Sequence, residues 1–189
     1  MIASDGRGSW RACTFTGTSP WLEPSGGTEH VARAAPEVTV AFAPVKGDRP
    51  EWVVQKLVEI GVDRIVVLRA ARSVVIWEGA RADRAIERLS RVAEQAAAQS
   101  RRAWIPEVEG VRNLDDLARE HPVVLAERGG GPIEAFLPLC VGPEGGWTDE
   151  ELEAASGLAG LGDGVLRSET AAIVAGTLVC ALRDRGFSQ

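Results

Sequence analysis

Hydrophobic positions from residue 46 onwards alternate between helical spacing and short continuous runs. Apolar residues recur at helical spacing from Pro50, which suits the first turn of a helix, to Gly61, which stands where a left-handed cap is expected. The apolar face of this predicted helix consists of Trp52, Val53, Leu57 and Ile60. The next run, residues 64–69, is apolar and bounded by charge, which favours a strand covered on both faces of a parallel sheet.

The same alternation continues to the end of the chain. The longest helical pattern covers residues 81–102. The later elements predicted are a helix near 113–120, strands at 122–127 and 139–141, a helix at 148–158, and a short strand at 164–170 that passes into a helix at 171–183. The glycine-rich residues 128–132 are expected to form a flexible loop. Because strands alternate with helices, the fold class predicted is α/β with a largely parallel sheet.

Residues 1–45 have a different character. Two stretches, Ser9 to Thr16 and Glu37 to Phe42, have β character and are separated by turn signals at proline and glycine. This is too little chain for a closed barrel or a stable independent domain. We therefore divide the chain into a small β domain, residues 1–45, and an α/β domain, residues 46–189.

Composition restricts the class of protein. The 189-residue sequence is 45% hydrophobic, and no apolar run approaches the roughly 20 residues that span a bilayer. The N-terminus lacks the basic and apolar regions of a signal peptide. Cys13, Cys140 and Cys180 lack metal-ligand spacing, so we expect buried reduced thiols and no metal site. A cytoplasmic protein without membrane contact is predicted.

Charge is unevenly distributed along the chain, whose net charge is −6. Residues 46–102 carry 12 Lys and Arg against 8 Asp and Glu, whereas residues 103–189 carry 6 against 15. A basic middle third is typical of a surface that faces a polyanion, but a solvated mixed surface has the same composition. On the long helix, one polar face could contact phosphates or bases, or could simply be solvated; it consists of Arg88, Arg91, Gln95, Gln99 and Arg102.

The stretch from Leu139 to Leu152 combines the end of a strand, a glycine-rich turn and the start of a helix. Thr148 can cap that helix while Glu151 reaches back to it. The glycines let a ligand approach the backbone and leave N–H groups free. The turn lacks a G-x-G-x-x-G pattern and a phosphate-binding lysine, and Glu144 favours a cationic or hydroxyl-bearing ligand. An ordinary strand-to-helix loop is the alternative.

Three loops that follow predicted strands are candidates for one binding site. They cover residues 127–132, 142–148 and 161–170. Ligands of parallel sheets bind beyond the carboxyl ends of the strands. We therefore expect these loops to meet around a ligand.

Seven short motifs make residues 46–189 similar to one known family. They are Lys46-Gly-Asp-Arg, Gln55-Lys-x-x-Glu-x-Gly-Val, Arg72-Ser-Val, Gln99-Ser-Arg, Ile105-Pro, Val141-Gly-Pro-Glu-Gly-Gly and Val165-Leu-Arg-Ser-Glu-Thr. In this order and spacing they resemble the bacterial 16S ribosomal RNA uracil-N3-methyltransferases of the SPOUT superfamily. The last two motifs together are the most specific part of the resemblance.

The resemblance implies a C-terminal part threaded as a trefoil knot, a homodimer, and S-adenosylmethionine as cofactor. It implies methylation of uracil N3 in 16S ribosomal RNA or the small ribosomal subunit, by in-line attack of N3 on the sulfonium methyl group. The positions that carry over to cofactor binding are Leu125, Glu127, Val141, Gly142, Pro143, Glu144, Gly145, Gly146, Leu161, Gly162, Val165, Leu166, Arg167 and Thr170.

Arg167 and Glu169 are the catalytic candidates within the last motif. We hypothesise that Arg167 positions the target uridine and that Glu169 holds the loop or assists removal of the N3 proton. The alternatives are a structural salt bridge for Arg167 and a helix N-terminal charge for Glu169. The candidates for RNA phosphate contacts, which would set the register of the RNA, are Lys46, Arg49, Lys56, Arg72, Gln99, Arg101 and Arg102.

The sequence departs from the family pattern in two places. The family has a complete PUA-like β-barrel at its N-terminus, whereas Ser4 to Gly8 resembles the middle of that barrel, so residues 1–45 are expected to form a partial PUA-like domain. Ala98-Gln-Ser-Arg101 stands where the family has Glu-Gln-Ser/Cys-Gly, which alters the local RNA contact. Two alternatives follow: a SPOUT RNA methyltransferase with a different target atom, or a non-catalytic RNA- or cofactor-binding homologue.

Overall fold

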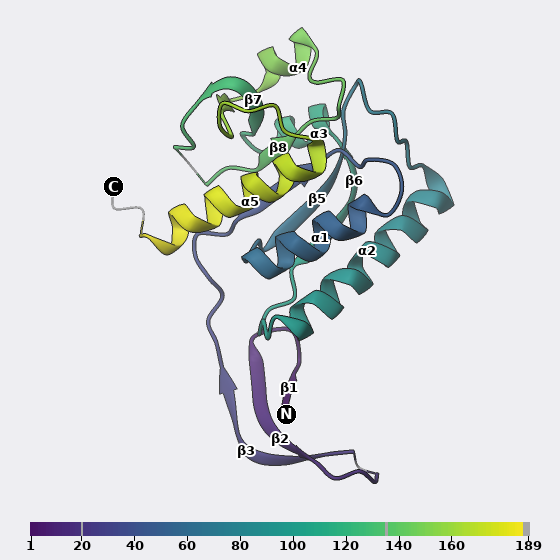
Figure 1. Cartoon of the computed structure of the whole chain (residues 1–189), viewed down its shortest axis with the longest axis vertical. Coiled ribbons are helices and arrows are strands. Elements are labelled where there is room, and N and C mark those ends of the chain that lie inside the picture. The colour runs from purple at the N-terminus through teal and green to yellow at the C-terminus, as the bar shows by residue number, and fades with distance from the viewer. Residues whose placement is uncertain (20, 135, 187–189) are drawn as a thin grey trace.

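The computed structural model describes residues 1–19, 21–134 and 136–186, which form two β-sheets and five helices (Figure 1). The larger sheet has six parallel strands in the order β6-β5-β4-β8-β7-β9. They are β4 (Thr39–Phe42), β5 (Arg64–Arg69), β6 (Glu107–Asn113), β7 (Val124–Gly131), β8 (Leu139–Val141) and β9 (Gly157–Ala159). The prediction of an α/β fold with a parallel sheet is therefore confirmed.

Helices cover both faces of this sheet. The first face carries α1 (Arg49–Ile60), α2 (Gly79–Gln99) and α5 (Ser168–Asp184), and the second carries α3 (Leu114–Glu120) and α4 (Asp149–Ala154) (Figure 1). Along the central strand, Val40 and Phe42 join the core on the first face, whereas Ala41 joins the core on the second. Because both faces are buried, β5 is apolar over residues 65–68 and bounded by an arginine at each end, as predicted.

The helix α1 begins and ends as its sequence predicts. Pro50 occupies the first turn, and Gly61 adopts a φ of 117° while its N–H donates to the last carbonyls of the helix. Val53 and Leu57 are fully buried, but the assignment of Trp52 to the apolar face is wrong, since 46% of its surface is exposed. Helical spacing marks the centre of a buried stripe, whereas packing against neighbouring elements sets its width.

Two predicted C-terminal elements are also wrong. The helix predicted at 148–158 ends at Ala154, and residues 157–159 form β9 beside β7. Residues 164–167 form no strand but belong to the loop before α5. In both places the conformation depends on whether a neighbouring strand pairs with the segment. The local sequence does not show whether such a strand is present.

Two further segments of the larger sheet are strands where none was predicted. β7 continues through Gly131, so most of the expected loop at 128–132 is extended chain that approaches β9. β6 lies at the end of the sheet, where only β5 pairs with it among the described strands. Its residues are only partly buried, so it lacks the continuous apolar run by which buried strands are identified.

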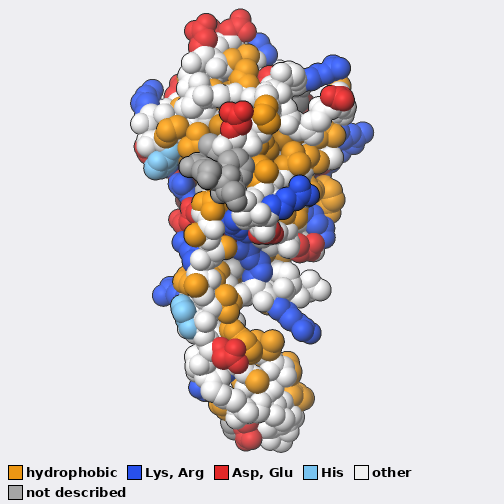
Figure 2. All heavy atoms as spheres, turned by 90° about the vertical axis from the view of Figure 1, so that its left-hand side faces the viewer, with side chains coloured by type: hydrophobic (Ala, Val, Ile, Leu, Met, Phe, Trp, Pro, Cys, Tyr) orange, Lys and Arg blue, Asp and Glu red, His pale blue; other side chains and the backbone are white. Residues whose placement is uncertain are grey.

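The smaller sheet is antiparallel and projects from the amino edge of the larger one, the edge at which the parallel strands begin (Figures 1 and 2). It consists of β1 (Ile2–Ser4), β2 (Ser9–Phe15) and β3 (Leu22–His30). β2 matches the stretch predicted to have β character, but the turn indicated by the proline and glycines of residues 24–27 is wrong, since they lie within β3. The predicted strand at 37–42 forms β4 of the larger sheet instead. Trp104 joins the two parts, because its indole N–H donates to the carbonyl of Val31 at 2.8 Å and its ring packs on Gly8.

A buried charge cluster connects three elements at this amino edge. Asp63 stands directly before β5, and its side chain is only 3% exposed. Its carboxylate accepts hydrogen bonds from Arg102 at 3.1 Å, from Arg183 at 2.5 Å and from the N–H of Val38 at 3.0 Å. The cluster therefore holds the segment after α2 and the end of α5 to the start of the sheet.

Two expectations from composition can be compared with the structure. Cys13, Cys140 and Cys180 are free and buried, as predicted. None of the helices in the described part of the chain is long and apolar enough to cross a membrane.

Candidate functional site

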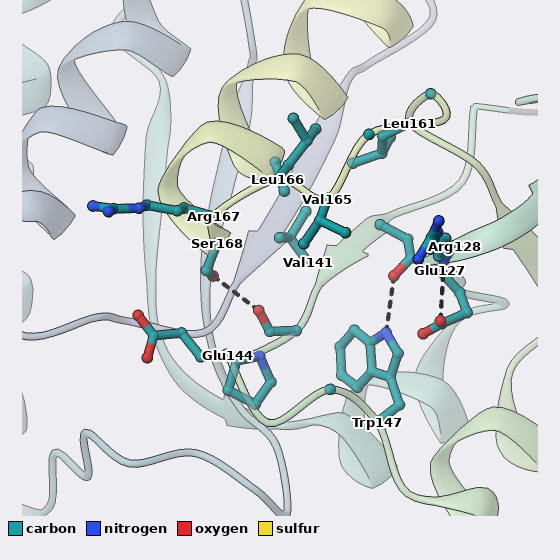
Figure 3. A pocket seen from close by; sticks show the side chains of 17 residues that line it. Glu127, Arg128, Val141, Glu144, Trp147, Leu161, Val165, Leu166, Arg167 and Ser168 are labelled. Carbon is teal, nitrogen blue, oxygen red and sulfur yellow. Dashed lines mark hydrogen bonds between the residues drawn. The ribbon is translucent and has the colours of Figure 1, made fainter.

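A cavity of about 440 Å³ opens at the carboxyl edge of the larger sheet, beyond the ends of β7, β8 and β9 (Figure 3). The three loops predicted to meet around a ligand, 127–132, 142–148 and 161–170, all contribute to its wall. The site therefore lies where parallel sheets usually bind ligands.

Local packing gives the turn after β8 a defined shape. A Cβ atom added to Gly142 would lie 2.9 Å from the ring of Trp147, so a glycine is required there. Gly146 has a φ of 69°, in the left-handed region. The predicted capping box of α4 is present, because the Thr148 hydroxyl accepts from the N–H of Glu151 at 3.3 Å and the Glu151 carboxylate accepts from the N–H of Thr148 at 2.8 Å.

Side chains from two other segments hold the same turn from outside. Arg72 donates to the carbonyls of Gly145 at 3.1 Å and Trp147 at 2.7 Å. Ser168, the first residue of α5, donates to the carbonyl of Gly142 at 2.8 Å. The turn is thus preorganised before a ligand arrives, which lowers the entropic cost of binding.

Trp147 contributes to the wall; it lies in the predicted loop 142–148 but is not among the individual cofactor residues implied by the resemblance. Its indole N–H donates to the carbonyl of Ala126 at 3.0 Å and so ties the end of β7 to the turn after β8. The ring is almost fully buried. The sequence feature that indicates its role is its position in a glycine-rich turn, because small neighbouring residues leave room for one large side chain.

The cavity has an apolar middle and two polar ends. In Figure 3, Val141 and Val165 lie between Arg167 with Glu144 on one side and Glu127 with Arg128 on the other. The Glu127 carboxylate accepts a hydrogen bond from the N–H of Arg128 at 3.0 Å. Such a cavity suits a ligand with a flat apolar part and charged or hydroxyl groups at its ends.

Most of the predicted cofactor residues lie in this wall, but not all of them. Those in the wall are Glu127, Val141, Gly142, Pro143, Glu144, Gly146, Leu161, Gly162, Val165, Leu166 and Arg167. Leu125 instead belongs to the core on the α3 side, Gly145 faces Arg72, and Thr170 lies on α5 outside the wall. The wall also contains residues outside that set. Arg128, Trp147, Gly164 and Ser168 belong to the three predicted loops, whereas Ala126 and Ala171 lie just outside them.

The structure separates the two catalytic candidates. Arg167 lines the cavity, and its guanidinium makes no hydrogen bond or ion pair to the described residues. Glu169 lies outside the wall and is 8% exposed, with its Oε1 3.3 Å from the guanidinium of Arg49. Its Oε2 is buried and has no hydrogen-bond partner among the described residues. Arg167 therefore does not form the structural salt bridge that was the alternative to its catalytic role, and Glu169 pairs with Arg49 instead.

The predicted RNA contacts are distributed over both edges of the sheet. Lys46, Arg49 and Arg72 lie at the carboxyl edge near the cavity, whereas Gln99, Arg101 and Arg102 lie at the opposite end, beside the smaller sheet. Lys56 lies within α1 and pairs with Glu59 at 2.7 Å. The structure therefore does not gather these residues into one surface.

Among the RNA candidates, Arg102 makes the most contacts within the fold. It bonds Asp63 and donates to the backbone carbonyls of Val58 and Val62 at 3.0 and 2.7 Å. Burial lowers the pKa of this guanidinium, while the Asp63 carboxylate opposes that shift. An RNA phosphate would have to displace these contacts.

Comparison with known proteins identifies relatives of this chain. The sequence model of the family described as RNA methyltransferase domain matches residues 33–180. The Ribosomal RNA small subunit methyltransferase E of Mycobacterium bovis is 37% identical over 174 residues, which cover 79% of this chain and 65% of the relative. The chain thus spans less than two thirds of that relative's length.

Solved structures share the fold over nearly the whole chain. A Legionella pneumophila protein, solved in complex with the bound cofactor SAM (S-adenosylmethionine), is 26% identical with a TM-score of 0.81, covering 95% of this chain and 81% of the other. The Ribosomal RNA small subunit methyltransferase E of Neisseria gonorrhoeae, bound to S-adenosylmethionine, has a TM-score of 0.82 at 23% identity and covers 100% of this chain and 84% of its own. The second likeness shows the fold alone.

Proposed function

Because the chain belongs to the RNA methyltransferase domain family, we propose that it transfers a methyl group from S-adenosylmethionine to uracil N3 of 16S ribosomal RNA in the small subunit. The observation that carries this proposal is the cavity at the carboxyl edge, in which all three predicted loops meet. The resemblance of the Gly-Pro-Glu-Gly-Gly and Leu-Arg-Ser-Glu-Thr motifs to the uracil-N3 enzymes supports the choice of target atom.

The residues of the cavity fit S-adenosylmethionine in size and chemistry. A volume of about 440 Å³ is within the range of small-molecule sites. Val141, Leu161 and Val165 offer apolar contacts to an adenine ring, and Glu127 offers a carboxylate to ribose hydroxyls or to the amine. Gly142 and Gly146 place backbone without side chains in the wall, where a ligand can approach it closely.

The cofactor supplies an electrophilic methyl group, and the chain has to align the uracil and help its N3 proton leave. We assign the alignment to Arg167, because this residue lines the cavity at the end opposite Glu127 and its guanidinium, which projects outward from that end, has no competing partner among the described residues (Figure 3). A guanidinium can donate to a uracil carbonyl oxygen and stabilise the negative charge that develops when N3 loses its proton. The proton passes to solvent at the open mouth of the site.

Glu169 is proposed to position this arginine rather than to accept the proton. It is buried, lies outside the wall and pairs with Arg49 at 3.3 Å. This pair connects the first turn of α5, which follows Arg167, to the first turn of α1. Its role is therefore to fix the start of α5, and through it the direction of Arg167.

Further properties of the family that the sequence resembles are proposed for this chain as well. We propose that its C-terminal segment is threaded as a trefoil knot, that it acts as a homodimer, and that β1–β3 represent part of a PUA-like domain that contacts RNA. The antiparallel order of β1–β3 supports the last of these. The cytoplasm, where ribosomal subunits are assembled, is the proposed location.

Methyl transfer from labelled S-adenosylmethionine to small subunits that lack the modification tests the proposed function. The expected product, identified by mass spectrometry of the nucleosides, is N3-methyluridine. Methylation at another atom would contradict the proposed target atom but would still show that the chain is an RNA methyltransferase. Bound cofactor with no transfer to subunits or free RNA would refute the proposed activity for this chain.

Arg167→Ala tests the assigned role. We expect kcat to fall by about 10²-fold, the usual scale for a group that assists proton transfer, with little change in the Kd for S-adenosylmethionine. Arg167→Lys should recover part of the loss, since it restores the charge but not the planar donor. Unchanged turnover in Arg167→Ala would remove Arg167 from the mechanism.

A further inference from the structure

A second hollow, of about 400 Å³, lies beside the first half of α2. We call it the basic pocket; its cationic residues are Lys46, Arg81, Arg84 and Arg88. Its apolar residues include Val75 and Trp77, and the Trp77 ring is only 7% exposed. Among the described residues, no acidic side chain lines it. The sequence pattern pointed to the face of α2 that contains Arg88, but did not single out Arg81 or Arg84.

Few acidic side chains neutralise the cations of the basic pocket. The side chains of Lys46, Arg81 and Arg84 make no ion pair or hydrogen bond to the described residues, and only Arg88 is paired, with Glu51 at 2.5 Å. Arg91, one turn further along α2 and outside the pocket, pairs with Glu87. Like charges gathered without acidic partners produce a positive potential that an anion relieves.

The backbone adds to this potential. In a parallel α/β unit each helix begins near the carboxyl edge, where the preceding strand ends. α1 and α2, of 12 and 21 residues, both begin at this edge (Figure 1). The positive ends of their macrodipoles therefore face the region occupied by the unpaired cations.

The basic pocket lies close to the cavity proposed to hold the cofactor. The loop from β4 to α1 supplies Lys46 to the pocket, and Ala43 at its start donates its N–H to the carbonyl of Val141 at 3.0 Å. Arg49 at its end pairs with Glu169, two residues after Arg167. One short loop therefore lines the basic pocket and contacts two residues at or beside the wall of the cavity, Val141 and Glu169.

We propose that the basic pocket binds backbone phosphates of the RNA strand next to the target nucleotide. The inference rests on the RNA substrate proposed above and adds a site for it. Arginine and lysine without acidic partners suit phosphodiester oxygens, and Val75 and Trp77 offer apolar surface to an adjoining ribose. Contacts of this kind fix the register of the RNA strand, so they help place the target nucleotide in the cavity. They do not distinguish one base sequence from another.

The test compares two double variants that remove the same charge. Arg81→Ala/Arg84→Ala removes two of the four cations of the basic pocket. Arg119→Ala/Arg185→Ala removes two exposed cations elsewhere on the surface. The probe is an unmodified small-subunit ribosomal RNA transcript, titrated at several salt concentrations. A separate titration with S-adenosylmethionine alone verifies that the cofactor site is intact in both variants.

The pocket variant should bind the transcript about tenfold more weakly than the control variant at moderate salt. The slope of log Kd against log salt should decrease by roughly 0.7–0.9 for each phosphate that the variant no longer neutralises. The KM for RNA should rise while kcat stays near that of the wild type. Cofactor affinity should not change.

Equal slopes and equal KM for the two double variants, in a protein that still methylates RNA, would overturn the proposed pocket and leave the proposed function standing. A wild-type protein that neither binds nor methylates RNA would overturn the proposed function, and this inference with it. The two failures are thus distinguished by the wild-type measurement.

Discussion

At the amino edge of the larger sheet Asp63 is enclosed by Arg102 and Arg183, whereas at the carboxyl edge Arg84 and Arg167 have no partner among the described residues. Both edges are rich in arginine, so composition does not distinguish them. The difference is burial. A charge that leaves water must be paired, while an exposed cation keeps its hydration and remains available to an anion.

The comparison separates residues that hold the fold from residues that can bind. The amino edge uses its arginines on backbone carbonyls and one carboxylate, which joins the helices to the sheet. At the carboxyl edge, Arg72 holds the turn after β8 through backbone carbonyls and Arg49 pairs with Glu169, but Arg167 has no partner in the described part of the chain. Substitutions at one edge should therefore change stability, and substitutions at the other should change ligand affinity.

The largest effect is expected for Asp63→Ala. Removing the carboxylate leaves two buried guanidinium groups and the N–H of Val38 without their acceptor, so the free energy of unfolding should fall by about 3–5 kcal/mol. Urea unfolding measures the loss. Asp63→Asn, which keeps one oxygen, should lose less. A loss no larger than that of the exposed Asp115→Ala would contradict the structural role of this edge.

A smaller effect, confined to the carboxyl edge, is expected for Gly142→Ala. The new Cβ would lie 2.9 Å from the ring of Trp147 and displace it, so affinity for S-adenosylmethionine should fall about tenfold or more, or about 1.4 kcal/mol. Calorimetric titration measures this loss. Gly110→Ala, where nothing lies within 4 Å of the added atom, should bind normally. Equal affinity of both variants would show that the turn does not touch the cofactor.

The smallest effect should appear only in alkaline solution. Burial raises the pKa of the Cys140 thiol from 9.0 to about 12. Between these values the unfolded chain has released the proton that the folded chain keeps, so stability falls as pH rises above 9. At pH 10 the loss from this thiol is about 1.4 kcal/mol.

Cys140→Ala isolates that contribution, since it lacks the titrating group. From pH 8 to pH 10 the wild type should lose about 1.4 kcal/mol more stability than this variant in urea unfolding. Cys13→Ala serves as a control, with a buried free cysteine in the smaller sheet. The same pH dependence in Cys140→Ala and the wild type would show that the thiol ionises equally easily in both states.

Much of the candidate site could be predicted because its signals are local. The capping box of Thr148 and Glu151 and the glycines of the turn are short-range patterns, and the three loops follow from the rule that ligands bind beyond strand ends. Trp147 and Ser168 lie in the predicted loops, but their individual roles could not be predicted, because they depend on Ala126 and Gly142, which other elements bring to them.

The elements show the same division. α1 has its Pro50 start and Gly61 cap in its own sequence, and residues 64–69 are apolar because both faces of β5 are covered. β9 carries no such signal, since residues 157–159 are extended only because β7 pairs with them. Local propensity competes with tertiary pairing, and for a short strand pairing prevails.

The α/β alternation, the ends of α1, the cap of α4 and the loops that surround the cavity can be read from the sequence, because each depends on residues close together in the chain. Which arginines are paired within the fold, and which remain available to a ligand, is set by the tertiary structure. Arg84 and Arg102 belong to the same helical pattern, residues 81–102, yet Arg102 packs against Asp63 whereas Arg84 lines the basic pocket. The physical reason is that pairing and desolvation depend on neighbours that are distant in sequence, as Asp63 and Arg183 are.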